Sequence, residues 1–251
     1  MVNPKPKPRP AVRNRGNRTP FFLALGAIAV AGASGLGYLA TKPKTAAVMD
    51  VDPSVPLPEG KGFTIGNPNA PVTVIEFADF ECPSCGQFAT VTEPDVRKRL
   101  VSTGQVFYRY LDYPLPGHRN TWPASMAAHC AADQNKFWEM HDRLFAGQFE
   151  WNGEATSNPK KFFKGYATEL ALDVPKWEQC FDSNAKRNEI AANKREGEKR
   201  AISQTPTFVI GRKVLPGALP YDQFKAYVDT AAALAPAAPA AAVPAKPAGS
   251  K

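Results

Sequence analysis

Residues 72–85 of this 251-residue chain read VTVIEFADFECPSC. The first nine residues are mostly apolar, with β-branched and aromatic side chains that do not strictly alternate with polar ones. That composition is typical of a central strand covered on both faces. The proline after the first cysteine fits the first turn of a helix, where a missing backbone N–H costs nothing. The sequence therefore predicts a buried strand that runs directly into a helix at Cys82.

The two cysteines of this stretch form a CxxC motif, Cys82-Pro83-Ser84-Cys85, at the expected helix N-terminus. Unpaired backbone N–H groups and the helix dipole stabilise a thiolate there, and the thiolate is the nucleophilic form of cysteine. A cross-link between residues only three apart closes too small a loop to stabilise a fold appreciably. The motif therefore indicates a redox-active dithiol rather than a structural link.

Zinc sites use the same CxxC spacing, but a structural site needs a second ligand pair. The other two cysteines, Cys130 and Cys180, are 50 positions apart. No paired spacing links the three histidines, His118, His129 and His141. We therefore expect no metal site, and the histidines fit packing or loop positions better than catalytic ones.

The net charge of +8 suggests a nucleic-acid partner at first sight, but its distribution argues against one. Eight of the 31 basic residues lie within residues 1–44, which contain no acidic residue. The other 23 basic residues balance the 23 acidic ones, so the rest of the chain carries no formal excess. A nucleic-acid-binding domain carries a basic patch on its folded surface. We therefore expect no nucleic-acid partner.

An uncharged run of 20 residues, 21–40, follows a basic segment, residues 1–20. As a helix the run would span roughly 30 Å, the thickness of the bilayer hydrocarbon core. Six basic residues precede it and two follow it closely, so the positive-inside tendency predicts a cytoplasmic N-terminus. We expect a single-pass anchor in the inner or plasma membrane, with the remainder of the chain periplasmic or extracellular.

A cleaved signal peptide is the alternative, with Ala-Gly-Ala at residues 31–33 as the cleavage site. The apolar run is longer than a usual signal-peptide core and continues past that site, which favours an uncleaved anchor. Either segment would place the remainder of the chain outside the cytoplasm, where disulfides persist.

The rest of the chain divides by composition. Residues 41–61, rich in Pro and Lys, are typical of an extended linker, and the Ala/Pro-rich residues 231–251 of a disordered tail. Between them, the patterns give the order β–α–β, a helical stretch at about 117–200, and then β–β–α. A strand–helix–strand unit of this length implies a parallel pair of strands. We therefore expect an α/β domain over residues 62–230 with an all-helical insertion.

Three separate motifs resemble the DsbA-like thioredoxin family. They are GNPNAPVTVIEFADFECPSC at residues 66–85, residues 131–145 with KFW at 136–138 and HD at 141–142, and TPTF at 205–208. The motifs occur in the family's order, and the resemblance covers about residues 63–230. It implies a thioredoxin fold with an inserted helical domain, and an extracytoplasmic dithiol oxidase or a related exchanger.

The resemblance also assigns roles to the residues of the CxxC motif. Cys82 would be the exposed nucleophile that forms a mixed disulfide with the substrate, and Cys85 the inward-facing thiol that resolves it. Pro83 and Ser84 would tune the pair. Many family members have His at the position of Ser84, so we expect the pKa of Cys82 to lie below its ordinary value but above the family's lowest.

Two further positions complete the candidate catalytic site. Thr205-Pro206 matches the family's cis-proline loop, which faces the cysteines and would pair the Thr205 backbone with an extended substrate. The alternative is that Pro206 merely begins a strand. Glu76 precedes Cys82 by six residues in a strand suited to burial, so we expect a raised pKa and proton exchange with Cys85. The alternative is a solvent-facing edge position for Glu76.

The two distant cysteines, Cys130 and Cys180, both fall within the expected helical insertion. We expect a structural disulfide between them, to which the chain-entropy model assigns about 4 kcal/mol for a loop of this size. Two buried free thiols, or a second redox pair that relays electrons, are the alternatives.

Together these features predict a membrane-tethered, extracytoplasmic thiol–disulfide oxidoreductase that donates its Cys82–Cys85 disulfide to reduced, unfolded or folding exported proteins. A membrane redox partner would reoxidise the pair. No metal or organic cofactor is required, because the dithiol is itself the redox group. The same chemistry in the opposite direction, as a reductase or isomerase, is one alternative, and a chaperone or scaffold with purely structural cysteines is another.

Overall fold

The computed structural model describes residues 60–235, together with Leu23 and the pair Met49–Asp50. Most of the segments predicted around the domain lie outside the described residues: 1–20, 21–40 except Leu23, most of 41–61, and 236–251. Among the helices that the structure describes, none is long and apolar enough to cross a membrane.

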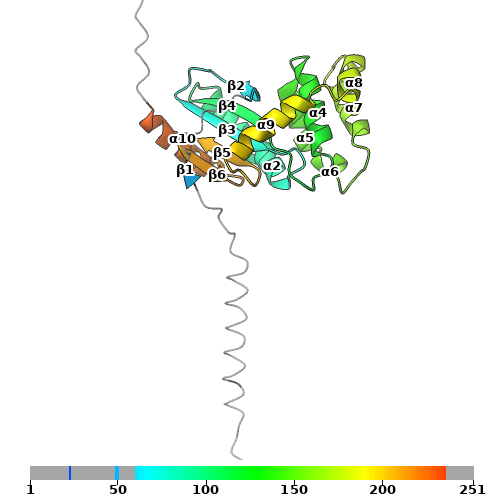
Figure 1. Ribbon diagram of the computed structural model, residues 1–251. Coiled ribbons are helices and arrows are strands. Elements are labelled where there is room, and N and C mark those ends of the chain that lie inside the picture. Colours follow the sequence, from blue (N-terminus) through cyan, green and yellow to red (C-terminus); the bar gives the residue numbers. More distant parts are fainter. Residues whose placement is uncertain (1–22, 24–48, 51–59, 236–251) are drawn as a thin grey trace, which may run out of the picture. The chain divides into compact units, whose positions relative to one another are not determined.

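A six-stranded mixed sheet forms the centre of the domain (Figure 1). Its strands are β1 (Met49–Asp50), β2 (Phe63–Ile65), β3 (Val72–Ala78), β4 (Val106–Asp112), β5 (Thr207–Ile210) and β6 (Lys213–Pro216). Their spatial order is β1-β6-β5-β3-β4-β2. Strands β3 and β4 pair in parallel, as the strand–helix–strand pattern predicts, and all other neighbours are antiparallel. The segment predicted as an extended linker thus contributes an edge strand, β1.

The helices form three groups along the chain (Figure 1). A continuous helical run follows β3 and contains α2 (Pro83–Gln87), the π-helical η1 (Phe88–Thr92), α3 (Glu93–Val96) and the π-helical η2 (Arg97–Val101). The insertion contains α4 (Thr121–Ala132), α5 (Phe137–Ala146), α6 (Gln148–Trp151), α7 (Lys160–Glu169), α8 (Val174–Asp182) and α9 (Arg187–Lys199). Helix α10 (Tyr221–Leu234) follows the last strand. The predicted junction of strand and helix, and the helical insertion, are both present.

Both faces of β3 are covered, which explains its nearly continuous apolar sequence. On one face Val74 packs in a cluster with Phe88 of the helical run and Phe224 of α10. Phe77 packs on the opposite face, in a separate aromatic and aliphatic cluster. Because side chains alternate along a strand, Glu76 shares the face of Val74, which the helical run covers.

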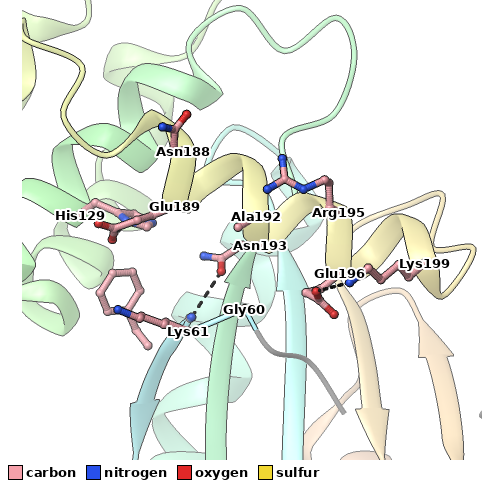
Figure 2. A pocket seen from close by; sticks show the side chains of 12 residues that line it. Gly60, Lys61, His129, Asn188, Glu189, Ala192, Asn193, Arg195, Glu196 and Lys199 are labelled. Carbon is pink, nitrogen blue, oxygen red and sulfur yellow. Dashed lines mark hydrogen bonds and ion pairs between the residues drawn. The ribbon is translucent and has the colours of Figure 1, made fainter. Parts of the chain in front are cut away.

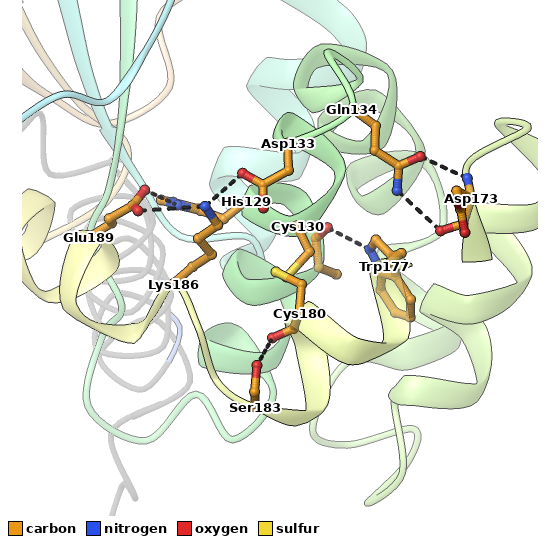
Figure 3. Close-up of a disulfide and its surroundings, with 11 residues drawn as sticks. His129, Cys130, Asp133, Gln134, Asp173, Trp177, Cys180, Ser183, Lys186 and Glu189 are labelled. Atoms are coloured by element: carbon orange, nitrogen blue, oxygen red, sulfur yellow. Dashed lines mark hydrogen bonds and ion pairs between the residues drawn. A yellow bond between two sulfur atoms is a disulfide. The ribbon is translucent and has the colours of Figure 1, made fainter. Parts of the chain in front are cut away.

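The insertion has a core of its own that includes the buried Trp151 and Trp177. A disulfide joins Cys130 of α4 to Cys180 of α8 beside this core (Figure 3). The Trp177 indole N–H donates a hydrogen bond to the Ala127 carbonyl at 3.0 Å, which further fixes α8 on α4. The structure therefore contains the cross-link that the sequence favours over free thiols.

Replacing both of these cysteines, Cys130→Ala/Cys180→Ala, should lower the free energy of unfolding by about 2–4 kcal/mol, because the cross-link no longer restricts the unfolded chain. Urea unfolding of the oxidised proteins, followed by circular dichroism, measures the difference. The matched control is Cys82→Ala/Cys85→Ala, whose missing loop is too short to contribute much. A smaller loss in the first protein than in the control would contradict a structural role.

Candidate active site

The two cysteines of the CxxC motif lie one helical turn apart at the junction of β3 and α2. Cys82 is the extended N-cap residue of α2, and its carbonyl accepts a hydrogen bond from the Gly86 N–H at 3.0 Å. Cys85 lies within the first turn. After β3 ends, the chain turns where the Asp79 carbonyl accepts a hydrogen bond from the Cys82 N–H at 3.0 Å. Both cysteines are free thiols in this structure.

The exposure of the first cysteine corrects one expectation. The sequence predicts an exposed nucleophile, but only 7 % of Cys82 is accessible, against 0 % of Cys85. The loop before β5 lies against it, and the Cys82 thiol donates a hydrogen bond to the Thr205 carbonyl at 3.4 Å. The adjacent Pro83 is exposed. Only a small part of Cys82 is therefore open to solvent.

The environment of Cys82 lowers its pKa to about 6. The largest cause is a hydrogen bond from the Cys85 thiol, and burial acts in the opposite direction. The backbone N–H groups of Cys85 and Ser84 add to the lowering. These N–H groups are the unpaired donors of the first helical turn, in agreement with the sequence analysis. The reduced protein therefore carries a nucleophilic thiolate at neutral pH.

The pKa of Cys85 shifts in the other direction. Burial raises it well above its ordinary value, and the neighbouring Cys82 and the carboxyl group of Glu76 raise it further. The two sulfurs therefore differ in charge: Cys82 is a thiolate near neutral pH, whereas Cys85 holds its proton whenever the bond between them is open.

Thr205 and Pro206 lie opposite the CxxC motif on the loop that leads into β5. The peptide bond between them is cis, and both residues are buried. The Thr205 carbonyl accepts from the Cys82 thiol, and the Pro206 carbonyl accepts from the Gly217 N–H at 2.7 Å. The fold thus brings this loop against Cys82 across 123 positions of sequence.

Glu76 lies in the interior near the cysteines and not at a solvent-facing edge. Its carboxyl group accepts a hydrogen bond from the Tyr108 hydroxyl at 2.6 Å. Burial raises the pKa of Glu76 well above its ordinary value, and the charge of Glu93 raises it further. Because the same carboxyl group acts on the pKa of Cys85, Glu76 is positioned to hold a proton near the buried sulfur.

The two acidic residues that precede the motif, Asp79 and Glu81, are buried but have hydrogen-bond donors. The Asp79 carboxylate accepts from the Glu81 N–H at 2.8 Å and pairs with His118 at 2.8 Å. The Glu81 carboxylate accepts from the N–H groups of Asn120 and Gly153 at 2.6 and 2.5 Å. The hydrogen bond to Asp79 raises the pKa of His118. His118, which the sequence places in a loop without a catalytic role, therefore offsets negative charge near the nucleophile.

Gln148, which the sequence analysis does not single out, joins the helical insertion to the CxxC motif. Its side-chain amide, at the start of α6, donates to the carbonyls of Phe80 and Cys82 at 2.7 and 2.9 Å. It also packs so closely on Gly86 that a Cβ there would meet its oxygen at 2.7 Å. A lone glutamine in a helical stretch gives no signal of such contacts, because its partners are 68 and 66 positions away.

A surface pocket of about 570 Å³ lies elsewhere, between α9 and the start of β2, and neither CxxC cysteine lines it (Figure 2). Figure 2 shows Asn193 of α9 near Lys61, with His129 and Glu189 at one end. The buried His129 pairs with Asp112 at 2.7 Å; burial lowers the pKa of His129, but this carboxylate raises it to about 9. Among the described residues, no group of three or more side chains has the arrangement of a metal site.

A sheet of this topology, with a CxxC dithiol at the N-terminus of the helix after β3 and a cis-proline loop opposite, defines a thioredoxin-fold dithiol protein. A model of the thioredoxin family matches residues 59–230, and the chain belongs to that family. Solved structures with this fold include alpha-DsbA1 of Wolbachia pipientis, with a TM-score of 0.63, 22 % identity, and coverage of 72 % of this chain and 94 % of that one. BdbD of Bacillus subtilis in its oxidised form has a TM-score of 0.60 and 20 % identity, and the match covers 76 % of this chain and all of BdbD.

Similar sequences include proteins of two kinds. The disulfide bond formation protein D of Bacillus subtilis is 25 % identical over 171 residues, which are 66 % of this chain and 74 % of that protein. The Na(+)/H(+) antiporter NhaA 3 of Salinispora tropica is 37 % identical over 165 residues, which are 65 % of this chain. The chain spans only about a quarter of that antiporter, 24 % of its length.

The reduced protein should show a thiolate titration in its ultraviolet absorbance with a midpoint near pH 6, because of the lowered pKa of Cys82. Cys85→Ala should raise the midpoint, since the strongest hydrogen bond to the thiolate is then lost. Cys82→Ala is the control and should show no titration in this range. A wild-type midpoint at the ordinary thiol value of about 8.5 would contradict the assignment.

Gln148→Ala should lower the free energy of unfolding by about 1–3 kcal/mol, because two buried carbonyls lose a donor. Chemical unfolding of the reduced protein measures the loss. Gln179→Ala is the matched control, since Gln179 is an exposed glutamine on another helix of the insertion, α8. Equal stabilities of the two variants would show that the contact with the CxxC motif contributes nothing.

Proposed function

We propose that this protein is an extracytoplasmic thiol–disulfide oxidoreductase that introduces disulfides into exported proteins through Cys82 and Cys85. The observation that carries the proposal is the difference between the two sulfurs: the pKa of Cys82 is lowered to about 6, whereas burial raises that of Cys85. Membership of the thioredoxin family and the likeness to a disulfide bond formation protein support it.

The reaction begins with the oxidised protein, in which Cys82 and Cys85 share a disulfide. A substrate thiolate attacks the Cys82 sulfur, the bond between the two cysteines breaks, and its electron pair goes to the Cys85 sulfur. A second substrate thiolate then attacks the substrate sulfur of the mixed disulfide. The substrate leaves with a new disulfide, and Cys82 leaves as a thiolate, which its low pKa favours. Two electrons pass from the substrate to the protein, and no other redox group is needed.

Proton transfer accompanies this exchange. Because burial raises the pKa of Cys85, the sulfur released in the first step takes up a proton. Glu76 is the proposed donor, since its own raised pKa keeps a proton available in the interior. Thr205 and Pro206 would line the approach of the substrate backbone to Cys82, and Pro83 and Ser84 would shape its rim.

The lowered pKa of Cys82 favours the oxidising direction. A reduced form stabilised as a thiolate makes the corresponding disulfide a stronger oxidant. A membrane redox partner would accept the electrons and restore the disulfide, and the uncharged segment 21–40 would hold the domain at the membrane. These parts of the proposal rest on the sequence and on the chemistry of the pair.

The test measures disulfide formation in a reduced, unfolded model protein, by counting its free thiols over time. Wild-type protein should oxidise it stoichiometrically, and Cys82→Ser should be inactive. Cys85→Ser, treated with the same substrate in disulfide form, should accumulate a mixed disulfide at Cys82, because the resolving thiol is missing. Full activity of Cys82→Ser would instead support a chaperone or scaffold.

The equilibrium potential of the pair against glutathione separates the two redox directions. A reduction potential above about −200 mV supports an oxidase or isomerase. A reduction potential below about −250 mV supports a reductase. We expect the higher value. Cys130→Ala/Cys180→Ala is the control, because its potential should equal that of the wild type if that disulfide takes no part in the exchange.

A further inference from the structure

The interior near Cys85 holds a cluster of ionisable side chains that the sulfur chemistry alone does not require. Glu93 of α3, Arg97 of η2 and His141 of α5 lie there beside Glu76. Glu76, Glu93 and His141 are all buried. Burial of ionisable groups is costly unless they are paired, so a cluster of this size calls for a physical explanation.

Glu93 and His141 face each other, each through one atom that has no hydrogen-bond partner in the part of the chain that the structure describes. One oxygen of Glu93, Oε1, accepts from Arg97 Nε and Nη2 at 2.8 and 2.6 Å. The other oxygen, Oε2, and His141 Nε2 are both buried, without a hydrogen-bond partner among the described residues, and 3.8 Å apart. With no competing partner, a small movement brings these two atoms within proton-transfer distance.

The second nitrogen of His141 leads toward the surface. Nδ1 lies 2.8 Å from the Asp142 carboxylate and 3.2 Å from Arg97 Nη2. A carboxylate favours the tautomer with the proton on Nδ1, whereas a guanidinium donor favours the proton on Nε2. The surroundings of His141 therefore support either tautomer, as a residue that passes protons requires.

Glu93, His141 and Asp142 form a row of ionisable groups, and its outer end, at Asp142, reaches solvent. The Asp142 side chain is 58 % exposed, and Asp142 and Arg97 both line a surface pocket of about 560 Å³. At the inner end, the charge of Glu93 acts on the pKa of Glu76, and Glu76 acts on that of Cys85. Close contacts thus run from Glu93 through His141 to the surface at Asp142, and charge interactions through Glu76 extend this row to the buried sulfur.

The proposed exchange reaction needs such a connection. When a substrate thiolate attacks Cys82, the electron pair of the broken bond goes to Cys85, whose burial disfavours a lasting charge. Cys85 itself is 0 % accessible, so solvent does not reach its sulfur directly. The proton for Cys85 must therefore come from the interior, and its donor must then be recharged from solvent.

We propose that Glu93 and His141 form a proton relay that connects Glu76 with the solvent at Asp142. The inference rests on the proposed function. Glu76 passes its proton to the Cys85 sulfur, and Glu93 and His141 deliver a replacement from solvent, so that one proton enters for each disulfide opened. Reoxidation runs the same path outward. All electrons stay on the sulfur atoms, and Glu93 and His141 are positioning residues because neither touches a reacting atom.

Charged and titratable groups from several elements surround the relay. These are Glu76 on β3, Tyr108 and Tyr110 on β4, Cys85 on α2, Arg97 on η2 and Asp142 on α5. Tyr108 donates its hydroxyl to Glu76, and the Tyr110 ring contacts that of His141 edge-on at 5.1 Å. A change of solvent pH therefore acts on the relay first at its exposed end, Asp142.

The test uses His141→Gln, which removes the imidazole ring, and Glu93→Gln, which replaces the carboxyl group by an amide. Each should slow the reduction of the oxidised protein by dithiothreitol, and its reoxidation by oxidised glutathione, by about 10-fold or more. Stopped-flow fluorescence measures both rates across pH. A relay accelerates both directions equally, so the equilibrium potential of His141→Gln should equal that of the wild type. Glu139→Gln, an exposed change on the same helix, is the matched control.

Unchanged rates in both variants would overturn the relay. A shifted potential, with slowing in one direction only, would also overturn it, because that is the effect of a purely electrostatic role. If the buried variants fail to fold, Asp142→Asn carries the test, since it changes an exposed side chain and should slow both directions. A wild-type protein that does not exchange through Cys82 refutes the proposed function itself, whereas normal exchange with unaffected variants refutes only the relay.

Discussion

The chemistry of this protein depends on the burial of one sulfur a single helical turn behind another. Because burial disfavours a charge on Cys85, this thiol keeps its proton and donates a hydrogen bond to Cys82. That bond is the largest cause of the lowered pKa of Cys82. The arrangement follows from the position of the CxxC motif: β3 is covered on both faces, so the helix that follows it starts inside the core and turns its second cysteine inward.

The helical insertion is part of the active site and not an appendage to the sheet. The Gln148 side chain of α6 donates hydrogen bonds to the carbonyls of Phe80 and Cys82. In the other direction, the carboxylate of Glu81, just before the CxxC motif, accepts hydrogen bonds from N–H groups of the insertion. Each contact satisfies a buried polar group whose loss would be costly. The insertion thereby fixes the first turn of α2, the turn whose N–H groups stabilise the thiolate.

Acidic groups close to a thiolate would normally raise its pKa, and the fold limits this effect in two ways. In front of the motif, Asp79 is paired with His118 and with backbone donors. In the interior, burial raises the pKa of Glu76 so that its neutral form is favoured, and Glu93 is paired with Arg97. Burying these ionisable groups lowers the stability of the fold. It also places a protonated carboxyl group and paired charges next to a reaction that moves protons.

The sequence by itself determined the elements that depend on neighbouring residues. The apolar run of β3, the proline after Cys82 and the helical periodicity of the insertion predict the strand, the helix start and the layout, because each reflects a local preference of the backbone. The tertiary structure decided the rest: the hydrogen bond of Cys82 to Thr205, the pairing of His118 with Asp79, the contact of Gln148 and the meeting of Glu93 with His141. These contacts join residues between 39 and 123 positions apart. No local pattern encodes them, because burial and hydrogen bonding depend on where distant segments of the chain come to lie.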